Sequence, residues 1–382
     1  MTLVACDVFA GGGGLSVGLK EAGFQIAAAV ELESHAFATY KANHPEVKAY
    51  LQDVRLITGK DLASASPSGK IDLLAGCPPC QGFCSLTAKY KRTDERNSLV
   101  LEIGRLVQEL QPLAVMMENV PGLAKQGGEL FQALVQQLKG LGYKVDWRVL
   151  QVADYGVPQS RRRFVLFAGR GFSIPFPDRT HSRTGSDGLP KWKTVRDAID
   201  GRSPAVTLRV ASANGGPQAF DWHVVRDMSE RNRARLSHAT PGGSRMKLPS
   251  RLKPVCHRGK YGGFSNVYGR MAWDREAPTI TGGCTTLSKG RFGHPSDERT
   301  ISVREAALLQ TFPPAYIIDT PYMDYACDIV GNALPCAFAA ILAKQCYATI
   351  ASFQGAPKMV DGASCVSPEK SQKRKRGDYV GT

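Results

Sequence analysis

The sequence of 382 residues lacks the long uninterrupted hydrophobic runs that mark membrane-spanning segments. No uninterrupted apolar run approaches the ~20 residues of a membrane span, so we expect no membrane association. The first residues lead straight into an apolar segment without a basic region, so no signal peptide is expected. Ten cysteines without regular spacing indicate a reducing compartment. These absences favour a cytoplasmic protein.

Acidic residues are scarce relative to basic ones. The chain has 34 Asp+Glu against 49 Lys+Arg, a net charge of +15. A basic excess of this size accompanies polyanionic partners, and nucleic acid is the first candidate. A second CxxC is also missing: Cys77 and Cys80 form the only one, and zinc needs about four ligands. We therefore expect no metal.

The N-terminal segment is typical of a nucleotide cradle. A buried strand over residues 3–9 is followed by the turn Gly11–Gly14 and a helix over 15–22, and Glu31 ends a second strand. Neither a strict G-x-G-x-x-G nor a Walker lysine is present, which favours an adenosine-bearing ligand other than a dinucleotide or ATP. A glycine-rich turn without any ligand is the alternative. Asp53, at the end of a third strand, could accept from an adenine amino group with Val54 packing on the ring, or cap the next helical turn.

Reactive side chains follow two other predicted strands. Two prolines after the strand 71–75 force the chain into a stiff loop that carries Cys80, and Glu118 follows the strand 113–117. Because carboxyl ends of parallel strands share an edge, we expect these side chains to lie close together. A thiol beside a proton-bearing carboxyl suggests attack on a conjugated ring, whereas a buried or redox-active cysteine is the alternative. Arg161 and Arg163 alternate on an extended segment and could meet a base, a phosphate or Glu118, or form a solvated edge.

Five motifs together resemble the ordered signature of cytosine-C5 DNA methyltransferases of the bacterial type. They are Phe9-Ala10-Gly11-Gly12-Gly13-Gly14, Pro79-Cys80-Gln81, Glu118-Asn119-Val120, Gln159-x-Arg161-x-Arg163 and Gly331-Asn332-x-x-Pro335. The resemblance spans about residues 3 to 345. It implies Cys80 as nucleophile, Glu118 on the cytosine Watson–Crick edge, and Arg161 and Arg163 as a supporting pair. It also implies S-adenosylmethionine as cofactor, with S-adenosylhomocysteine as product, held by Phe9, Ala10, Gly11, Gly13, Gly14, Glu31, Leu32, Asp53, Val54, Pro79, Asn332 and Ala333. Cys84 departs from the serine common in the family, which puts a local hydrogen bond in doubt.

The implied function is transfer of a methyl group to carbon 5 of cytosine in a specific duplex DNA sequence. Cys80 would add to carbon 6 of a base flipped out of the helix, since such an attack is impossible within the stack. A cognate restriction endonuclease acting on the same site is an implied partner. Two alternatives stay open: a tRNA methyltransferase on the same scaffold, and a catalytically silent DNA-binding regulator. The protein would act at the nucleoid in a bacterium or in the nucleus of a eukaryote.

The expected fold is α/β, a Rossmann-like mixed sheet of a class I methyltransferase with a second, smaller, irregular β-rich target-recognition domain. We place the catalytic domain at 1–170 and 269–350, the recognition domain at 171–268, and a disordered basic tail at 351–382. Residues 221–260 contain ten Lys+Arg against three Asp+Glu, which suits phosphate and base contacts. A monomer is expected, because one chain carries every motif.

Overall fold

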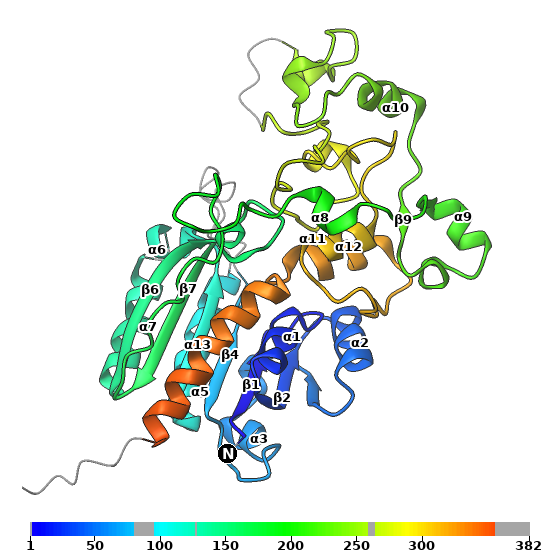
Figure 1. The fold of residues 1–382 in the computed structure, drawn as a ribbon. Coiled ribbons are helices and arrows are strands. Elements are labelled where there is room, and N and C mark those ends of the chain that lie inside the picture. Colours follow the sequence, from blue (N-terminus) through cyan, green and yellow to red (C-terminus); the bar gives the residue numbers. More distant parts are fainter. Residues whose placement is uncertain (1, 80–94, 127, 259–263, 356–382) are drawn as a thin grey trace, which may run out of the picture.

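A seven-stranded mixed sheet is the centre of the computed structural model, which describes residues 2–79, 95–126, 128–258 and 264–355 (Figure 1). Its strands are β1 (Val4–Val8), β2 (Gln25–Glu31), β3 (Lys48–Leu51), β4 (Leu73–Gly76), β5 (Ala114–Asn119), β6 (Tyr143–Gln151) and β7 (Arg162–Arg170). Their order is β3-β2-β1-β4-β5-β7-β6, and β7 runs antiparallel to both of its neighbours. The predicted mixed α/β sheet is confirmed.

Helices cover both faces of this sheet. They are α1 (Gly14–Glu21), α2 (Ser34–Asn43), α3 (Gly59–Ala63), α5 (Val100–Leu110), α6 (Gly122–Gln126), α7 (Gly128–Gly140) and α13 (Cys336–Gly355). Successive strand residues alternate between two cores, so that Leu73 packs with α1 and α13 whereas Leu74 packs with α5 and α7. The near-continuous apolar sequences of β1, β4 and β5 are thus explained, because every residue of these three strands is buried.

The helix α13 is the longest helix drawn and crosses one face of the sheet (Figure 1). By length and composition alone, Met323–Gly355 would pass for a membrane span, but 72% of its most apolar window is buried inside the protein, as in a core helix. The helix continues to Gly355, so the boundary predicted at 351 is too early. Cys346 and Ile350 pack on the core about one helical turn apart, and α13 continues beyond them to Gly355. The rest of the predicted tail lies outside the described residues.

The segment between β7 and α11 is built from short elements and irregular loops. It contains α8 (Val195–Ile199), β8 (Val206–Thr207), α9 (Leu208–Ala213), β9 (Val224–Val225) and α10 (Glu230–Ser237), and it is followed by α11 (Val303–Leu309) and α12 (Met323–Asn332). Its predicted irregularity is seen, but its β-rich character is not confirmed, since β8 and β9 pair over two residues each. Thr207 and Ser229 accept from backbone N–H groups and start helical turns instead.

Buried arginines satisfy part of the backbone that a sheet would otherwise pair. Arg270 donates to the carbonyls of His294 and Asp297 at 2.6 and 2.7 Å, and to that of Leu236 at 3.0 Å. Such side chain–backbone bonds hold loops together without strands, because each guanidinium carries five donors. Short 3₁₀ helices complete the chain: η1 (Val54–Leu56), η3 (Glu95–Leu99), η4 (Val152–Tyr155), η5 (Pro217–Phe220), η6 (Arg245–Lys247), η7 (Val255–His257) and η8 (Leu287–Lys289).

Candidate functional site

The glycine turn after β1 has the backbone geometry of a ligand cradle. Phe9, Gly11 and Gly13 have φ angles of 61°, 55° and 92°, in the left-handed region that favours glycine. A Cβ at Gly11 would meet nothing within 4 Å, so this residue faces open space. A Cβ at Gly13 would lie 2.5 Å from the Tyr316 hydroxyl, so packing also requires glycine there. Ala10 is buried, and Gly14 begins α1.

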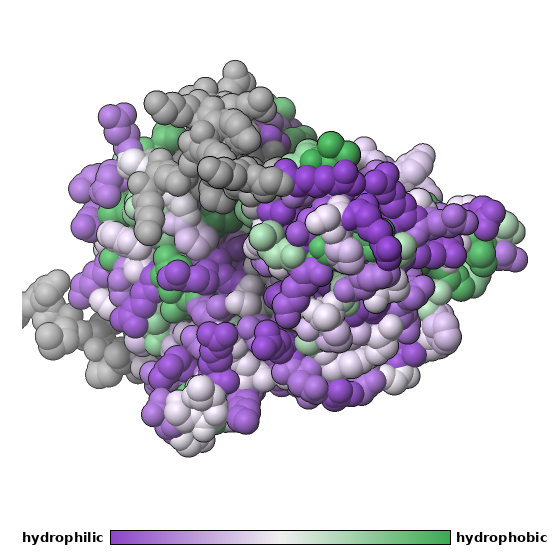
Figure 2. Space-filling view, turned by 90° about the horizontal axis from the view of Figure 1, so that it is seen from above, coloured by the Kyte–Doolittle hydropathy of each residue, from purple (hydrophilic) through white to green (hydrophobic). Residues whose placement is uncertain are grey.

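Glu31 joins the end of β2 to this turn. Its Oε2 accepts from the backbone N–H of Gly11 at 2.7 Å, and its Oε1 accepts from the N–H of Glu33 at 2.8 Å. Burial raises the pKa of this carboxyl. Leu32 follows with 65% of its side chain exposed, so an apolar surface stands next to a carboxylate at the carboxyl edge of the sheet. Figure 2 shows this edge from above, with hydrophilic side chains over much of its surface and a hollow near its middle.

Asp53 and Val54 lie beside Glu31 but have local partners. The N–H of Gln52 donates to the Glu31 carbonyl at 3.0 Å, which brings the following residues to the same edge. Asp53 caps η1 through the N–H of Arg55 and pairs with the Arg55 guanidinium, which lowers the pKa of the carboxyl. The capping alternative is therefore confirmed, and a contact of Asp53 with adenine stays a prediction. Val54 is buried.

The C-terminal residues expected to bind cofactor pack directly against the glycine turn. A Cβ at Gly14 would lie 2.9 Å from the Leu334 carbonyl oxygen and 3.3 Å from the Ala333 Cβ. Asn332 is exposed at the end of α12. The structure thus brings Ala333 and Gly14, more than 300 residues apart, into one corner of the fold.

Glu118 and Arg163 form a buried ion pair at the adjoining strand ends. Arg163 Nε lies 2.6 Å from Glu118 Oε1, with 12% and 9% of the two side chains exposed. The N–H is not aimed at Oε1, which has no hydrogen-bond partner among the described residues. Cys77 is half-buried, and the pKa of its thiol is raised well above the usual value, first by loss of solvation and then by the charge of Glu118. Cys77 therefore stays a neutral thiol, which agrees with a structural role.

The loop that carries the expected nucleophile starts beside this ion pair. The register of β4 with β5 places Gly76 opposite Met117, so Cys77 and Glu118 follow neighbouring strand positions. Asn119 Nδ2 donates to the Pro78 carbonyl at 3.1 Å and ties the loop to β5. Pro79 is the last residue described before the loop. Cys80 itself and Cys84 lie outside the described residues, so their placement is not tested.

Arg161 does not join Arg163 on Glu118. Its Nη1 donates to the carbonyls of Ile280 and Gly331 at 2.7 and 3.1 Å, and the side chain is only 3% exposed. Through these bonds Arg161, which directly precedes β7, links the start of that strand to Ile280 and to Gly331 near the end of α12. The structure therefore brings together Glu118 and Arg163 and places Arg161 at a separate junction.

Two buried glutamines at this junction were not predicted as site residues. Gln159 Oε1 accepts from the Ile280 N–H at 2.9 Å, and its Nε2 donates to Gln310 Oε1 at 2.7 Å. Gln159 belongs to the arginine motif, which was a usable signal. Gln310 stands at the end of α11 in an apolar helix pattern, and its role depends on contacts that no local pattern contains.

Comparisons with known proteins agree on one family. The family model for C-5 cytosine-specific DNA methylase matches residues 3–348. The chain is 35% identical over 343 residues to the Type II methylase M.HgiDII of Herpetosiphon aurantiacus, covering 88% of this chain and 93% of that protein. It is 34% identical to the Type II methyltransferase M1.HphI of Haemophilus parahaemolyticus, covering 88% and 84%. A structure of S. pombe Dnmt2 methyltransferase has a TM-score of 0.61 at 17% identity, covering 92% and 99%, and shares the fold.

Proposed function

The chain belongs to the C-5 cytosine-specific DNA methylases, and from this premise we propose that it methylates carbon 5 of cytosine in a specific duplex DNA sequence with S-adenosylmethionine as donor. The observation that carries the proposal is the buried Glu118–Arg163 pair beside the loop that leads to Cys80. A carboxyl at this position can meet a base edge, and the adjacent loop can bring a thiolate to the same ring.

The residues at the glycine turn fit the adenosine part of the cofactor. Gly11 faces open space, so its bare backbone permits close approach of a ligand. The Glu31 carboxylate has lone pairs left to accept from ribose hydroxyls, and the exposed Leu32 side chain offers an apolar surface to an adenine ring. We assign the methionine part to the neighbourhood of Pro79 and Asn332. When bound, S-adenosylmethionine supplies an electrophilic methyl group on a sulfonium.

The chain's own residues make cytosine reactive enough to accept that methyl group. The Cys80 thiolate forms a bond to carbon 6. The electron pair of the carbon 5–carbon 6 double bond is displaced through carbon 4 toward N3. Glu118 holds the proton at N3 where charge develops, while Arg163 holds Glu118 in place. After methylation of carbon 5, water takes the carbon-5 proton, the electron pair left behind re-forms the carbon 5–carbon 6 double bond, and Cys80 departs as the thiolate.

The basic segment between β7 and α11 is the proposed reader of the DNA sequence. We propose 171–268 as the target-recognition domain and 1–170 with 269–355 as the catalytic domain, the last bound following the end of α13. The protein would act as a monomer in the cytoplasm. The names of the relatives as Type II methyltransferases support a restriction endonuclease for the same site as a partner. Methylation of carbon 5 requires the target cytosine to leave the duplex.

The test is transfer of labelled methyl groups from S-adenosylmethionine to duplex DNA and, in parallel, to total tRNA. We expect label in DNA cytosine. Cys80→Ser should lose at least about a thousand-fold in rate, because no second group supplies the nucleophile. Cys80→Ser should still bind S-adenosylhomocysteine in calorimetry, which shows that the variant is folded.

Other outcomes would change the proposal in defined ways. Label only in tRNA would reject the DNA substrate and retain the Cys80 chemistry. Cofactor binding without any transfer would indicate a silent regulator. Activity retained in Cys80→Ser would overturn the covalent mechanism.

A further inference from the structure

The segment that follows α11 contacts the backbone on both sides of the proposed cofactor site. It supplies Gln310 at the end of α11 and Tyr316 in the loop before α12. Both side chains are buried, at 0% and 6% exposure. Gln310 donates to a main-chain carbonyl of α12, and Tyr316 donates to one of the glycine turn.

Tyr316 holds the glycine turn through its hydroxyl. The phenol donates to the Gly12 carbonyl at 2.6 Å, within the turn whose neighbours Gly11 and Gly13 have left-handed backbones. Burial raises the pKa of Tyr316 well above its usual value, so the hydroxyl keeps its proton and remains a donor. The same oxygen lies only 2.5 Å from the position that a Cβ of Gly13 would take, so the turn and the phenol pack closely.

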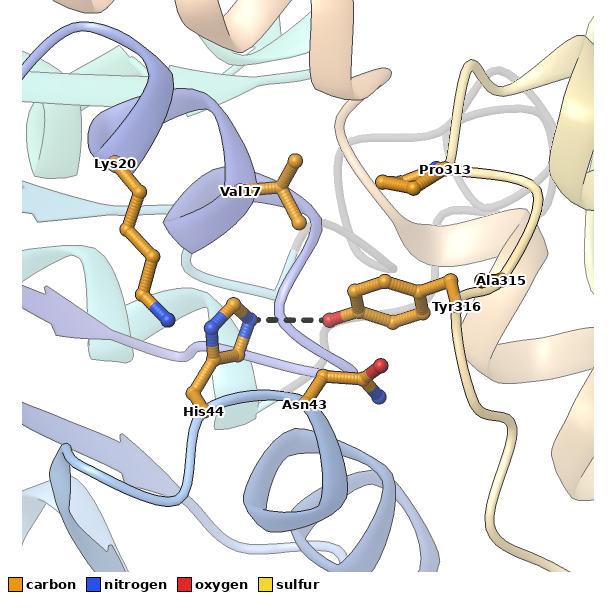
Figure 3. Close-up of a pocket in the computed structure, with 7 residues that line it drawn as sticks. All are labelled: Val17, Lys20, Asn43, His44, Pro313, Ala315 and Tyr316. Atoms are coloured by element: carbon orange, nitrogen blue, oxygen red, sulfur yellow. Dashed lines mark hydrogen bonds between the residues drawn. The ribbon is translucent and has the colours of Figure 1, made fainter.

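His44 supports the phenol from the other side. Figure 3 shows a ring nitrogen of His44 pointing at the Tyr316 hydroxyl in a pocket of about 290 Å³, with Nε2 3.1 Å from the hydroxyl oxygen. Burial lowers the pKa of His44 to about 4, so the ring is neutral at physiological pH. Because the Tyr316 proton is directed to Gly12, Nε2 must be the donor of this pair.

Asn43 fixes the loop that carries Tyr316. Its Oδ1 accepts from the Ile317 N–H at 3.0 Å, and its Nδ2 donates to the Ile317 carbonyl at 2.8 Å. This two-way contact joins the loop to the end of α2. Tyr316 is therefore held on both sides, which gives its hydroxyl a defined position against the turn.

Gln310 holds the other part of the site. Its Nε2 donates to the carbonyls of Val330 at 2.7 Å and Ala333 at 3.0 Å, and so spans Asn332. Its Oε1 accepts from Gln159. The side-chain amide of Gln310 therefore fixes the backbone conformation around Asn332, whose side chain is exposed.

We propose that Tyr316 and Gln310 are positioning residues that hold the glycine turn and the 330–333 backbone in the arrangement that binds S-adenosylmethionine. The inference rests on the proposed function. Neither residue touches the cofactor in this scheme. They act by holding the glycine turn and the 330–333 backbone, which contact the cofactor.

The test is Tyr316→Phe, measured by calorimetry with S-adenosylhomocysteine as the probe and by steady-state kinetics. We expect the dissociation constant and the KM for S-adenosylmethionine to rise roughly 5- to 30-fold, the range of one lost buried hydrogen bond. The kcat at saturating cofactor and the KM for DNA should change less than about twofold. Gln310→Met should likewise weaken cofactor binding with little change in kcat or in the KM for DNA, because it releases the 330–333 backbone.

Tyr143→Phe is the matched control. Its hydroxyl also donates to a buried carbonyl, that of Pro112, at 2.6 Å, but at the opposite end of the sheet. We expect a similar loss of thermal stability with unchanged cofactor affinity. Equal cofactor affinity in wild type and Tyr316→Phe, or equal weakening in the two tyrosine variants, would overturn the inference.

The outcomes separate this inference from the proposed function. If Gln310→Met does not fold, Tyr316→Phe decides the question alone. If the wild type binds no S-adenosylhomocysteine, the proposed cofactor is wrong and the inference falls with it. If the wild type binds and methylates DNA while both variants bind equally well, only the positioning role is rejected.

Discussion

A buried carboxyl next to the glycine turn shows how single residues of the site are set by their surroundings. Asp7 in β1 is fully buried, and its Oδ2 accepts from Ser16 Oγ at 2.6 Å, which in turn contacts the Tyr40 hydroxyl at 2.8 Å. Its Oδ1 has no hydrogen-bond partner among the described residues. Burial raises the pKa of Asp7 from 3.8 to about 7, so the carboxyl is protonated in mildly acidic solution.

This raised pKa predicts a pH-dependent stability that Asp7→Asn removes. The folded state binds the proton more tightly than the unfolded chain, so the stability contribution is complete below about pH 4 and is lost as pH rises through about 7. Unfolding in urea from pH 4.5 to 8 should show wild type losing up to roughly 4 kcal/mol relative to Asp7→Asn. Asparagine imitates the protonated acid in shape and is uncharged. Parallel stability curves for the two proteins would show that Asp7 does not titrate in this range.

The positions of site residues could be predicted where they follow from a motif or a strand end. They were missed where they depend on tertiary contacts. Glu31 and Glu118 could be placed from strand ends, because parallel strands deliver their last residues to one edge. The different partners of Arg161 and Arg163 could not, since strand alternation does not say which carbonyl or carboxylate lies opposite. Tyr316 and Gln310 were missed because their partners lie on other elements, from twenty to about three hundred residues away.

At the scale of elements, α1 depends on glycine for its contact with α13. Gly18 is buried in the middle of α1, and a Cβ there would lie 2.5 Å from both the Ala339 Cβ and the Ala340 backbone nitrogen. The two helices approach so closely because both contact surfaces carry small residues. This contact holds the helix that begins at the glycine turn.

Gly18→Ala should therefore destabilise the protein even though alanine favours helices. We expect a loss of about 2–4 kcal/mol in the free energy of unfolding, since backbone must move to admit one methyl group. Gly140→Ala is the control, because that helical glycine ends α7 with nothing within 4 Å of its added Cβ. There the change should be neutral or stabilising by up to about 1 kcal/mol. Similar denaturation midpoints for the two variants would refute the close-packing explanation.

Most elements of the sheet domain could be predicted, and most of the segment between β7 and α11 could not. The bounds of β1, α1 and β5 lie within one or two residues of the predicted segments 3–9, 15–22 and 113–117, since each segment is apolar and has turn residues at one end. The antiparallel insertion of β7 between β5 and β6 leaves no local trace in the sequence. In the irregular segment, side chain–backbone bonds such as those of Arg270 replace strand pairing, and these have no period to detect.

At the scale of the whole molecule, the positive charge is distributed unequally between structural and available side chains. Arg235 in α10 is buried, donates to the Leu252 carbonyl at 2.8 Å and lies over the Tyr268 ring. Arg231 and Arg233 on the same helix are exposed. The count of basic residues therefore overstates the charge that a polyanion can meet, and burial identifies which arginines remain for phosphates.

The paired variant Arg231→Gln with Arg233→Gln should weaken binding to duplex DNA and reduce its dependence on salt. Each phosphate contact contributes about 0.9 to the slope of log affinity against log salt concentration, so losing both lowers the slope by up to about 1.8. Binding of S-adenosylhomocysteine should be unchanged, because the described side-chain contacts of α10 are with Leu252, Tyr268 and Arg270 rather than with cofactor-site residues. Arg235→Gln should instead lower the melting temperature, since it leaves the partly buried Leu252 carbonyl without its donor. An unchanged salt slope in the paired variant would place the DNA contacts on other exposed cations, and the recognition surface would then not include α10.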